Sequence, residues 1–191
     1  MDHLYCVIDQ FGFPTQVMVT MSPHESAIPG PDVQDMSDVE RNGYWFDGTE
    51  WHSVGARPSE WHAIDRLNKT WIGNYEGLKA FIKQRVDEVR TDHGFEPIEY
   101  NSSLFDADWN AVKSILMWRT QLALPKGFFW RDSDNADHPA NAAFLAGLGE
   151  AIARRDYTLR KIAWAKKAEI DALPDDLEMI KAYDLQSGWG Q

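Results

Sequence analysis

Four tryptophans fall close together in the first half of the chain, in segments that turn-forming residues interrupt at short intervals. They are Trp45, Trp51, Trp61 and Trp71. Their spacing lacks the period of a helical face, and large aromatic side chains favour strands. The dipeptide Asp47-Gly48, which separates the first two tryptophans, is typical of a type I′ hairpin turn. The pattern predicts a small β-domain that includes a hairpin over residues 43–53.

The rest of this region predicts further short strands. Residues 4–8 and 16–21 are apolar or β-branched runs separated by a turn with glycine and proline, which predicts an N-terminal hairpin. Strands are also expected at 61–64 and 70–72, and we expect these two strands and the hairpin over residues 43–53 to form a small antiparallel sheet. Residues 22–42 contain three prolines and no hydrophobic period, so we expect a long loop or linker there.

From Tyr75 the hydrophobic period changes to that of a helix. The apolar residues that follow one helical face are Leu78, Phe81, Ile82, Val86 and Val89. We expect this helix to stop at Gly94 and to be followed by a second hairpin over residues 96–105.

A second helix is expected in the next segment. Asp106 or Asp108 can cap its N-terminus, and Pro125 is expected to end it. Residues 128–131 then predict a short strand, which the turn-rich residues 132–135 close.

The longest element is a helix expected from about residue 139 to 173. Asn135 or Asp137 can start it through side-chain bonds to the backbone, and Pro174 ends it. One helical turn or two are expected in 175–183. The long helix is either a bundle helix with a solvated basic face or one helix of a coiled coil in an oligomer. Its basic residues are Arg154, Arg155, Arg160, Lys161, Lys166 and Lys167.

Together these elements predict an α+β protein with a tryptophan-rich β-domain over residues 1–73 and a mixed helical domain over 74–191. The net charge of −11 disfavours contact with phosphate backbones, so no nucleic-acid partner is expected. Without a long apolar run or a signal-peptide pattern, the chain is expected to be cytosolic when made and to have no membrane partner. Cys6 is the one cysteine, which excludes an internal disulfide, and we expect it to be buried in a strand.

The sequence contains no pattern that predicts catalysis. A nucleophile elbow, a phosphate-binding loop, a dinucleotide fingerprint and the spacing of a catalytic triad are all missing, so the protein is expected not to be an enzyme, with no catalytic residues and no cofactor. His52 and His62 could approach a metal ion together with nearby acids, but their spacing fixes no geometry, and no metal site is predicted. Asp132, Asp134 and Asp137 lack the glycine and late glutamate of a calcium loop, so they predict a turn.

Three patches of the sequence resemble proteins of phage tails. Tyr5 to Met21 resembles a phage pattern of a strand, a glycine-containing turn and a valine-rich strand. Tyr44 to Trp51, with Pro58, His62 and Lys69-Thr70-Trp71, resembles the aromatic cassette of tail-fibre assembly proteins. Residues 82–173 are similar to a C-terminal tail domain of unknown function. The chain as a whole therefore resembles bacteriophage tail-fibre-associated proteins, in particular small tail-fibre assembly proteins.

This resemblance implies a non-enzymatic protein that binds a tail-fibre or baseplate protein. It would be a structural connector or cap, or a factor that helps the fibre assemble, in the host cytoplasm during assembly and then in the virion tail. The symmetry of tail organelles favours self-association or docking on a trimeric fibre. An alternative function is a virion receptor-binding module that stacks host-surface glycans on exposed tryptophans.

The predicted partner-binding residues are aromatic. Tryptophan and tyrosine can form either the core of a small sheet or the hot spots of an interface, and the sequence leaves both readings open. The tail tryptophan either docks into a partner or folds back on its own domain. The residues are Tyr44, Trp45, Trp51, Trp61, Trp71 and Trp189.

Overall fold

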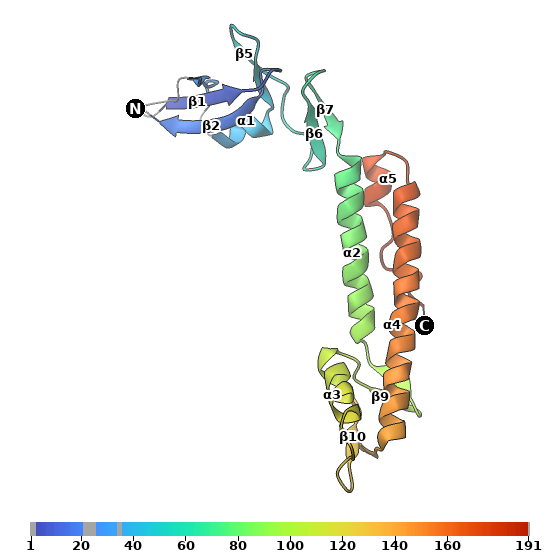
Figure 1. The fold of residues 1–191 in the computed structure, drawn as a ribbon. Helices are drawn as coiled ribbons and strands as arrows, with labels where there is room; N and C mark the ends of the chain where they lie inside the picture. The colour runs from blue at the N-terminus through green and yellow to red at the C-terminus, as the bar shows by residue number, and fades with distance from the viewer. Residues whose placement is uncertain (1–2, 21–25, 34–35, 191) are drawn as a thin grey trace. The chain divides into compact units, whose positions relative to one another are not determined.

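The computed structural model describes residues 3–20, 26–33 and 36–190 and shows an α+β fold, the class that the sequence predicts (Figure 1). The chain divides into two compact units. The first contains residues 1–78 and 175–177, and we call residues 1–78 the β-module. The second, which we call the helical unit, contains residues 79–174 and 178–191. The boundary expected from the sequence lies after residue 73.

The β-module opens with the predicted N-terminal hairpin. β1 (His3–Ile8) pairs antiparallel with β2 (Pro14–Thr20). Cys6 is buried in β1, as predicted, and burial raises the pKa of its thiol to about 11. The thiol is therefore protonated at neutral pH and behaves as a small apolar group. Met21, the last residue of the second predicted strand, lies outside the described residues.

The prediction of a long loop over residues 22–42 is wrong in two places. β3 (Ile28–Pro29) pairs with β1, which gives the sheet order β2-β1-β3, and α1 (Met36–Arg41) buries Val39. Both elements are too short to show a hydrophobic period in the sequence. Their contacts with the N-terminal hairpin order them instead. Residues 22–25 and 34–35 lie outside the described residues.

The predicted tryptophan hairpins are present, but they do not join into one sheet. β4 (Tyr44–Phe46) pairs with β5 (Trp51–Ser53), and β6 (His62–Asp65) pairs with β7 (Thr70–Gly73). In the described part of the β-module these are two separate sheets beside the first one. Strands this short offer few backbone groups for pairing, so side chains and loops must link the sheets.

Gly12 shows how closely the first two sheets approach. It has a positive φ of 87°, and its carbonyl accepts a hydrogen bond of 3.0 Å from the backbone N–H of Phe46. A Cβ atom at this position would lie 2.1 Å from the carbonyl oxygen of Phe46. Glycine is therefore required here by both its backbone conformation and the available space.

The helical unit is built on two long helices. α2 (Tyr75–Phe95) begins at the predicted residue and ends one residue after the predicted stop, and α4 (Ala142–Ala172) lies beside it (Figure 1). Lys83 Nζ lies 2.6 Å from Asp171 Oδ1, and Lys167 Nζ lies 2.7 Å from Asp87 Oδ2. From Lys83 to Asp87 along α2, the partner on α4 changes from Asp171 back to Lys167, so the two helices are antiparallel.

The predicted second hairpin and helix pack on the start of α4. β8 (Ile98–Tyr100) and β9 (Ser103–Phe105) form the hairpin, and α3 (Trp109–Arg119) follows. Asp108, one of the two predicted caps, accepts the backbone N–H of Ala111 at 2.8 Å. α3 ends well before Pro125. The buried centre of this region consists of Phe105, Ile115 and Leu148.

The start of the long helix is later than expected. Its cap is Asn141, whose side chain accepts the backbone N–H of Phe144 at 2.9 Å, and not Asn135 or Asp137. Residues 137–139 instead form β11 (Asp137–Pro139), the unpredicted partner of β10 (Phe129–Arg131). A hydrogen-bonded partner strand outweighs the weak helical signal of these residues.

Asp132 closes the loop between β10 and β11. Its carboxylate accepts the backbone N–H groups of Asp134 and Ala136 and lies 2.7 Å from His138 Nε2. These hydrogen bonds lower the pKa of Asp132, and the bond with His138 has the largest effect. The turn predicted from the aspartates is therefore confirmed. The chain closes with α5 (Leu177–Lys181), within the range predicted for the last helical turns.

Candidate functional site

The tryptophans of the β-module are half-buried, and Trp51 and Trp71 use their indole N–H groups within the module. Trp51 Nε1 donates to the carbonyl oxygen of Pro29 at 2.8 Å, and Trp71 Nε1 donates to that of Gly55 at 2.9 Å. Trp51 therefore links the β4–β5 hairpin to β3. These side chains help to hold the short sheets together, which is the structural role that the sequence left open.

The ring of Trp45 contacts other side chains of the β-module. The Nζ atom of Lys69 lies 4.2 Å from the Trp45 ring centroid and 4.7 Å from that of Phe13, and the ring of His52 stacks on Trp45 at 4.8 Å. Tyr44 and Trp71 line a cleft of about 590 Å³ in the same module. Trp61 is half-buried beside β6. The predicted aromatic residues thus contribute both to internal contacts and to a cleft.

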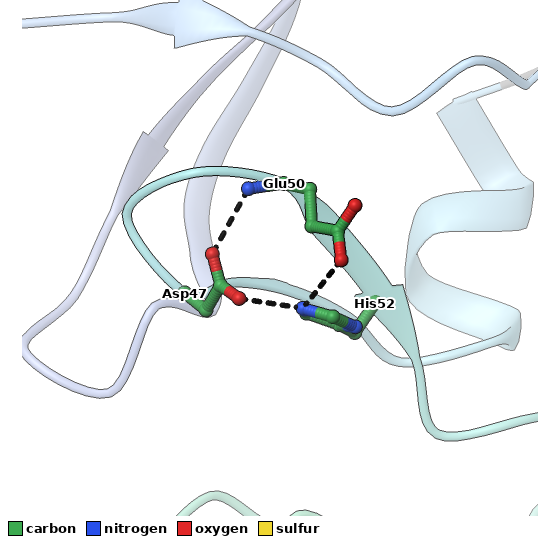
Figure 2. Close-up of side chains that lie close together, drawn as sticks. All are labelled: Asp47, Glu50 and His52. Atoms are coloured by element: carbon green, nitrogen blue, oxygen red, sulfur yellow. Dashed lines mark hydrogen bonds and ion pairs between the residues drawn. The ribbon is translucent and has the colours of Figure 1, made fainter.

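A cluster of three ligand-type side chains lies on the loop of the first tryptophan hairpin (Figure 2). His52 Nε2 lies 2.7 Å from Asp47 Oδ2 and 3.8 Å from Glu50 Oε1. The other Asp47 oxygen accepts the backbone N–H groups of Thr49 and Glu50. Because Phe46 pairs with Trp51, the loop has four residues, and the predicted two-residue type I′ turn is wrong.

These contacts of Asp47 fix the conformation of its loop. The backbone N–H of Glu50, then the ring of His52, lower the pKa of Asp47 to about 2. One ligand atom from each of Asp47, Glu50 and His52 lies within 4.8 Å of the others, so this is where a cation could be held. Among the described residues, His62 is not part of this cluster, and its Nδ1 lies 2.8 Å from Ser59 Oγ.

Trp189, one of the predicted partner-binding residues, is buried within its own unit. Its side chain is 5% exposed, its Nε1 donates to the carbonyl oxygen of Leu185 at 2.7 Å, and its ring stacks on His93 at 5.5 Å. The tail therefore folds back on the helical unit, which is the second of the two arrangements considered from the sequence. A side chain with these contacts is not available to a partner. Gln191 lies outside the described residues.

The helical unit contains an apolar groove that the sequence did not predict. It has a volume of about 400 Å³ and lies between the end of α2, α3 and the first half of α4. Its apolar lining includes Val112, Ile115 and Ile152, and it is flanked by Phe95, Trp109 and Leu116. Trp109 is 72% exposed and Leu116 is 57% exposed. Large apolar groups that remain in water beside a groove are typical of interaction sites.

Three arginines also line the groove. Arg160 Nε lies 2.8 Å from Asp156 Oδ2, and Arg90 Nη1 lies 3.4 Å from Asp156 Oδ1. The third, Arg119, makes no ion pair within the part of the chain that the structure describes. The groove thus combines an apolar surface with an excess of positive charge.

One signal in the sequence could have revealed this groove. α3 buries Ile115 toward the core, yet it also carries Trp109, Leu116 and Met117 on positions that remain exposed. A helix with apolar residues on two faces has more apolar surface than one core contact needs. Such an excess predicts a second contact.

In the ranges that the structure describes, no helix is both long enough and apolar enough to cross a membrane. Searches of curated proteins and of solved structures find no significant match to this chain. The sequence profile of one family, described as a domain of unknown function (DUF4376), matches residues 76–185, which include nearly all of α2 and extend through α3, α4 and α5. The chain therefore belongs to the DUF4376 family.

Proposed function

We propose that this protein is a non-enzymatic phage tail protein that associates with the tail fibre by protein–protein binding. It acts as a connector or cap, or as a factor that helps the fibre to assemble, in the host cytoplasm and then in the virion tail. The phage assignment rests on the resemblance of the two hairpin regions and of residues 82–173 to tail-fibre-associated proteins.

The observation that carries the binding function is the exposed apolar surface of α3 beside its groove. Trp109 and Leu116 are 72% and 57% exposed although they belong to a helix whose other face is packed. Burying such side chains against a partner is favourable by about 25 cal/mol for each Å² of apolar surface removed from water. Tryptophan and arginine, both present at this groove, are enriched among the residues that dominate binding.

The contacts in the β-module lend less support to glycan stacking. Trp51 and Trp71 use their N–H groups internally, and Trp45 carries Lys69 and His52 on its ring. A change of tryptophan fluorescence on addition of host polysaccharide would argue for that alternative.

The test of the proposed function is the amount of this protein in purified phage particles, measured by mass spectrometry relative to the fibre polypeptide. Stoichiometric presence supports a connector or cap. Absence from particles, together with co-purification with the fibre polypeptide from infected-cell lysate, supports an assembly factor that leaves. If the protein is found neither in particles nor with the fibre polypeptide, the proposal is wrong.

A further inference from the structure

We propose that the groove between α2, α3 and α4 binds a partner segment that presents apolar side chains flanked by carboxylates. This inference deepens the proposed function and rests on it only in assuming that the protein acts by binding another protein. It specifies which surface binds and what chemistry the partner carries.

The apolar part of the site is built from two layers. Ile115, 2% exposed, belongs to the core of the helical unit, and Val112 and Ile152 lie beside it in the groove lining. Phe95, Trp109 and Leu116 flank this lining and are 39%, 72% and 57% exposed. A firm floor with exposed apolar flanks suits the side chains of a partner segment, because its residues can enter the groove while its backbone stays outside.

The positive charge of the groove favours a partner whose polar side chains are carboxylates. Arg90, Arg119 and Arg160 line it together with one acid, Asp156. Asp156 already lies within 3.4 Å of one arginine and 2.8 Å of another. Arg119 has no ion pair in the described ranges, so its donors are available. Guanidinium groups bind carboxylates through two parallel hydrogen bonds, and such pairs are stronger beside an apolar surface than in open water.

The same charges argue against a second copy of this chain as the occupant. A twofold contact through this surface would place the groove of one copy against the groove of the other. The arginines of both copies would then face one another, with one aspartate in each copy already engaged. Like charges brought together at an interface disfavour it, so the occupant is a different, acidic segment.

The experiment measures binding of two synthetic amphipathic peptides to the full-length protein. The peptides share the same leucine positions, and one carries glutamate and the other lysine at every polar position. Titration calorimetry is expected to show that the glutamate peptide binds at least about tenfold more tightly. The whole chain carries a charge of −11, so its overall field favours the lysine peptide, and a preference for glutamate requires a local site.

Two variants and one control locate the site. Arg119→Glu is expected to remove the preference for the glutamate peptide, and Leu116→Ser is expected to weaken binding of that peptide about tenfold. Both side chains are exposed, so circular dichroism should show an unchanged fold. Lys126→Glu makes the same change of charge at an exposed residue outside the groove and should leave the preference intact.

Three results would overturn the inference. The first is equal or tighter binding of the lysine peptide, or no binding of either peptide. The second is an equal effect of Arg119→Glu and Lys126→Glu. The third is a dimer in sedimentation that Leu116→Ser dissociates, which would assign the groove to a second copy. The peptides contain no fibre sequence, so failure here leaves the particle measurement unaffected, and the reverse also holds.

Discussion

Lys166 shows at the residue scale why a tryptophan near the chain end is buried. Its side chain lies on α4 and is 7% exposed, and its Nζ donates to the carbonyl oxygen of Asp184 at 3.1 Å. The same Nζ lies 5.4 Å from the ring centroid of Tyr183 and 5.6 Å from that of Trp189. A buried ammonium group is costly unless it finds such partners, and the C-terminal segment supplies them.

Replacing this tryptophan should therefore destabilise the helical unit. Trp189→Ala is expected to lower the free energy of unfolding by about 3 kcal/mol, because it removes a large buried side chain. Urea unfolding followed by far-UV circular dichroism would measure the change. The matched control is Trp164→Ala on α4, where the side chain is 59% exposed and the expected change is below about 0.5 kcal/mol. Equal effects of the two substitutions would show that the tail does not pack as described.

Asp47 predicts a pH dependence in the β-module. Its pKa is lowered to about 2 in the folded chain, against about 3.9 in an unfolded chain. A carboxyl group whose pKa is lowered on folding stabilises the fold at pH values above its pKa in the unfolded chain. This contribution is lost as the pH falls toward 2. Thermal unfolding should show Asp47→Asn to be less stable than the natural chain at pH 6, with the gap closing as the pH falls from 4 to 2.

The matched control for this prediction is Asp32→Asn, at an exposed aspartate of the same module. It makes the same chemical change at a carboxylate that accepts no backbone N–H within the described residues, and it should leave the thermal midpoint nearly unchanged. A gap between Asp47→Asn and the natural chain that stays constant down to pH 2 would contradict the assigned role of Asp47.

At the scale of the element, α3 illustrates how a cap is chosen. Asp106 and Asp108 are equivalent in the sequence, but the structure gives the cap to Asp108, whose side chain accepts the backbone N–H of Ala111. Asp108→Ala is expected to lower the free energy of unfolding by about 1 kcal/mol. Asp106→Ala, two residues earlier, should change it by less than about 0.5 kcal/mol. Chemical denaturation of both variants would decide, and a larger effect at Asp106 would contradict the cap.

The elements differ in how far the sequence reveals them. α2 carries an apolar face over several turns and begins at the predicted Tyr75, whereas α1 has the single buried residue Val39 and was not predicted. β11 was missed for a related reason, because His138 and its neighbours gain their strand conformation from pairing with β10. Long periodic elements are visible locally, and short ones depend on their partners.

For the whole molecule, the division into two compact units predicts independent folding of the C-terminal part. A fragment of residues 74–191 contains α2, α4 and the ion pairs between them. It is expected to keep its helical circular dichroism spectrum and to unfold in one cooperative thermal transition. A fragment of residues 96–191 lacks α2 and should lose that transition, because the face of α4 that packs on α2 would be exposed to water.

The opposite result would be informative. If the fragment of residues 74–191 shows helical content but no cooperative transition, then the helical unit needs the β-module for its stability. The two units would then form one folding unit, in spite of their separate compactness.

The sequence by itself determined the α+β class, the N-terminal and tryptophan hairpins, the hairpin before α3 and the two long helices. Each follows from a local pattern: turn residues between aromatic runs, or an apolar face repeated over several turns. The buried state of Cys6 was likewise visible in its apolar neighbours. Only the tertiary structure separated the described strands of the β-module into three sheets, buried Trp189 against Lys166, and brought Trp109, Leu116 and Arg119 to one groove. These features depend on contacts between residues far apart in the chain, and no local pattern encodes which distant surfaces will meet.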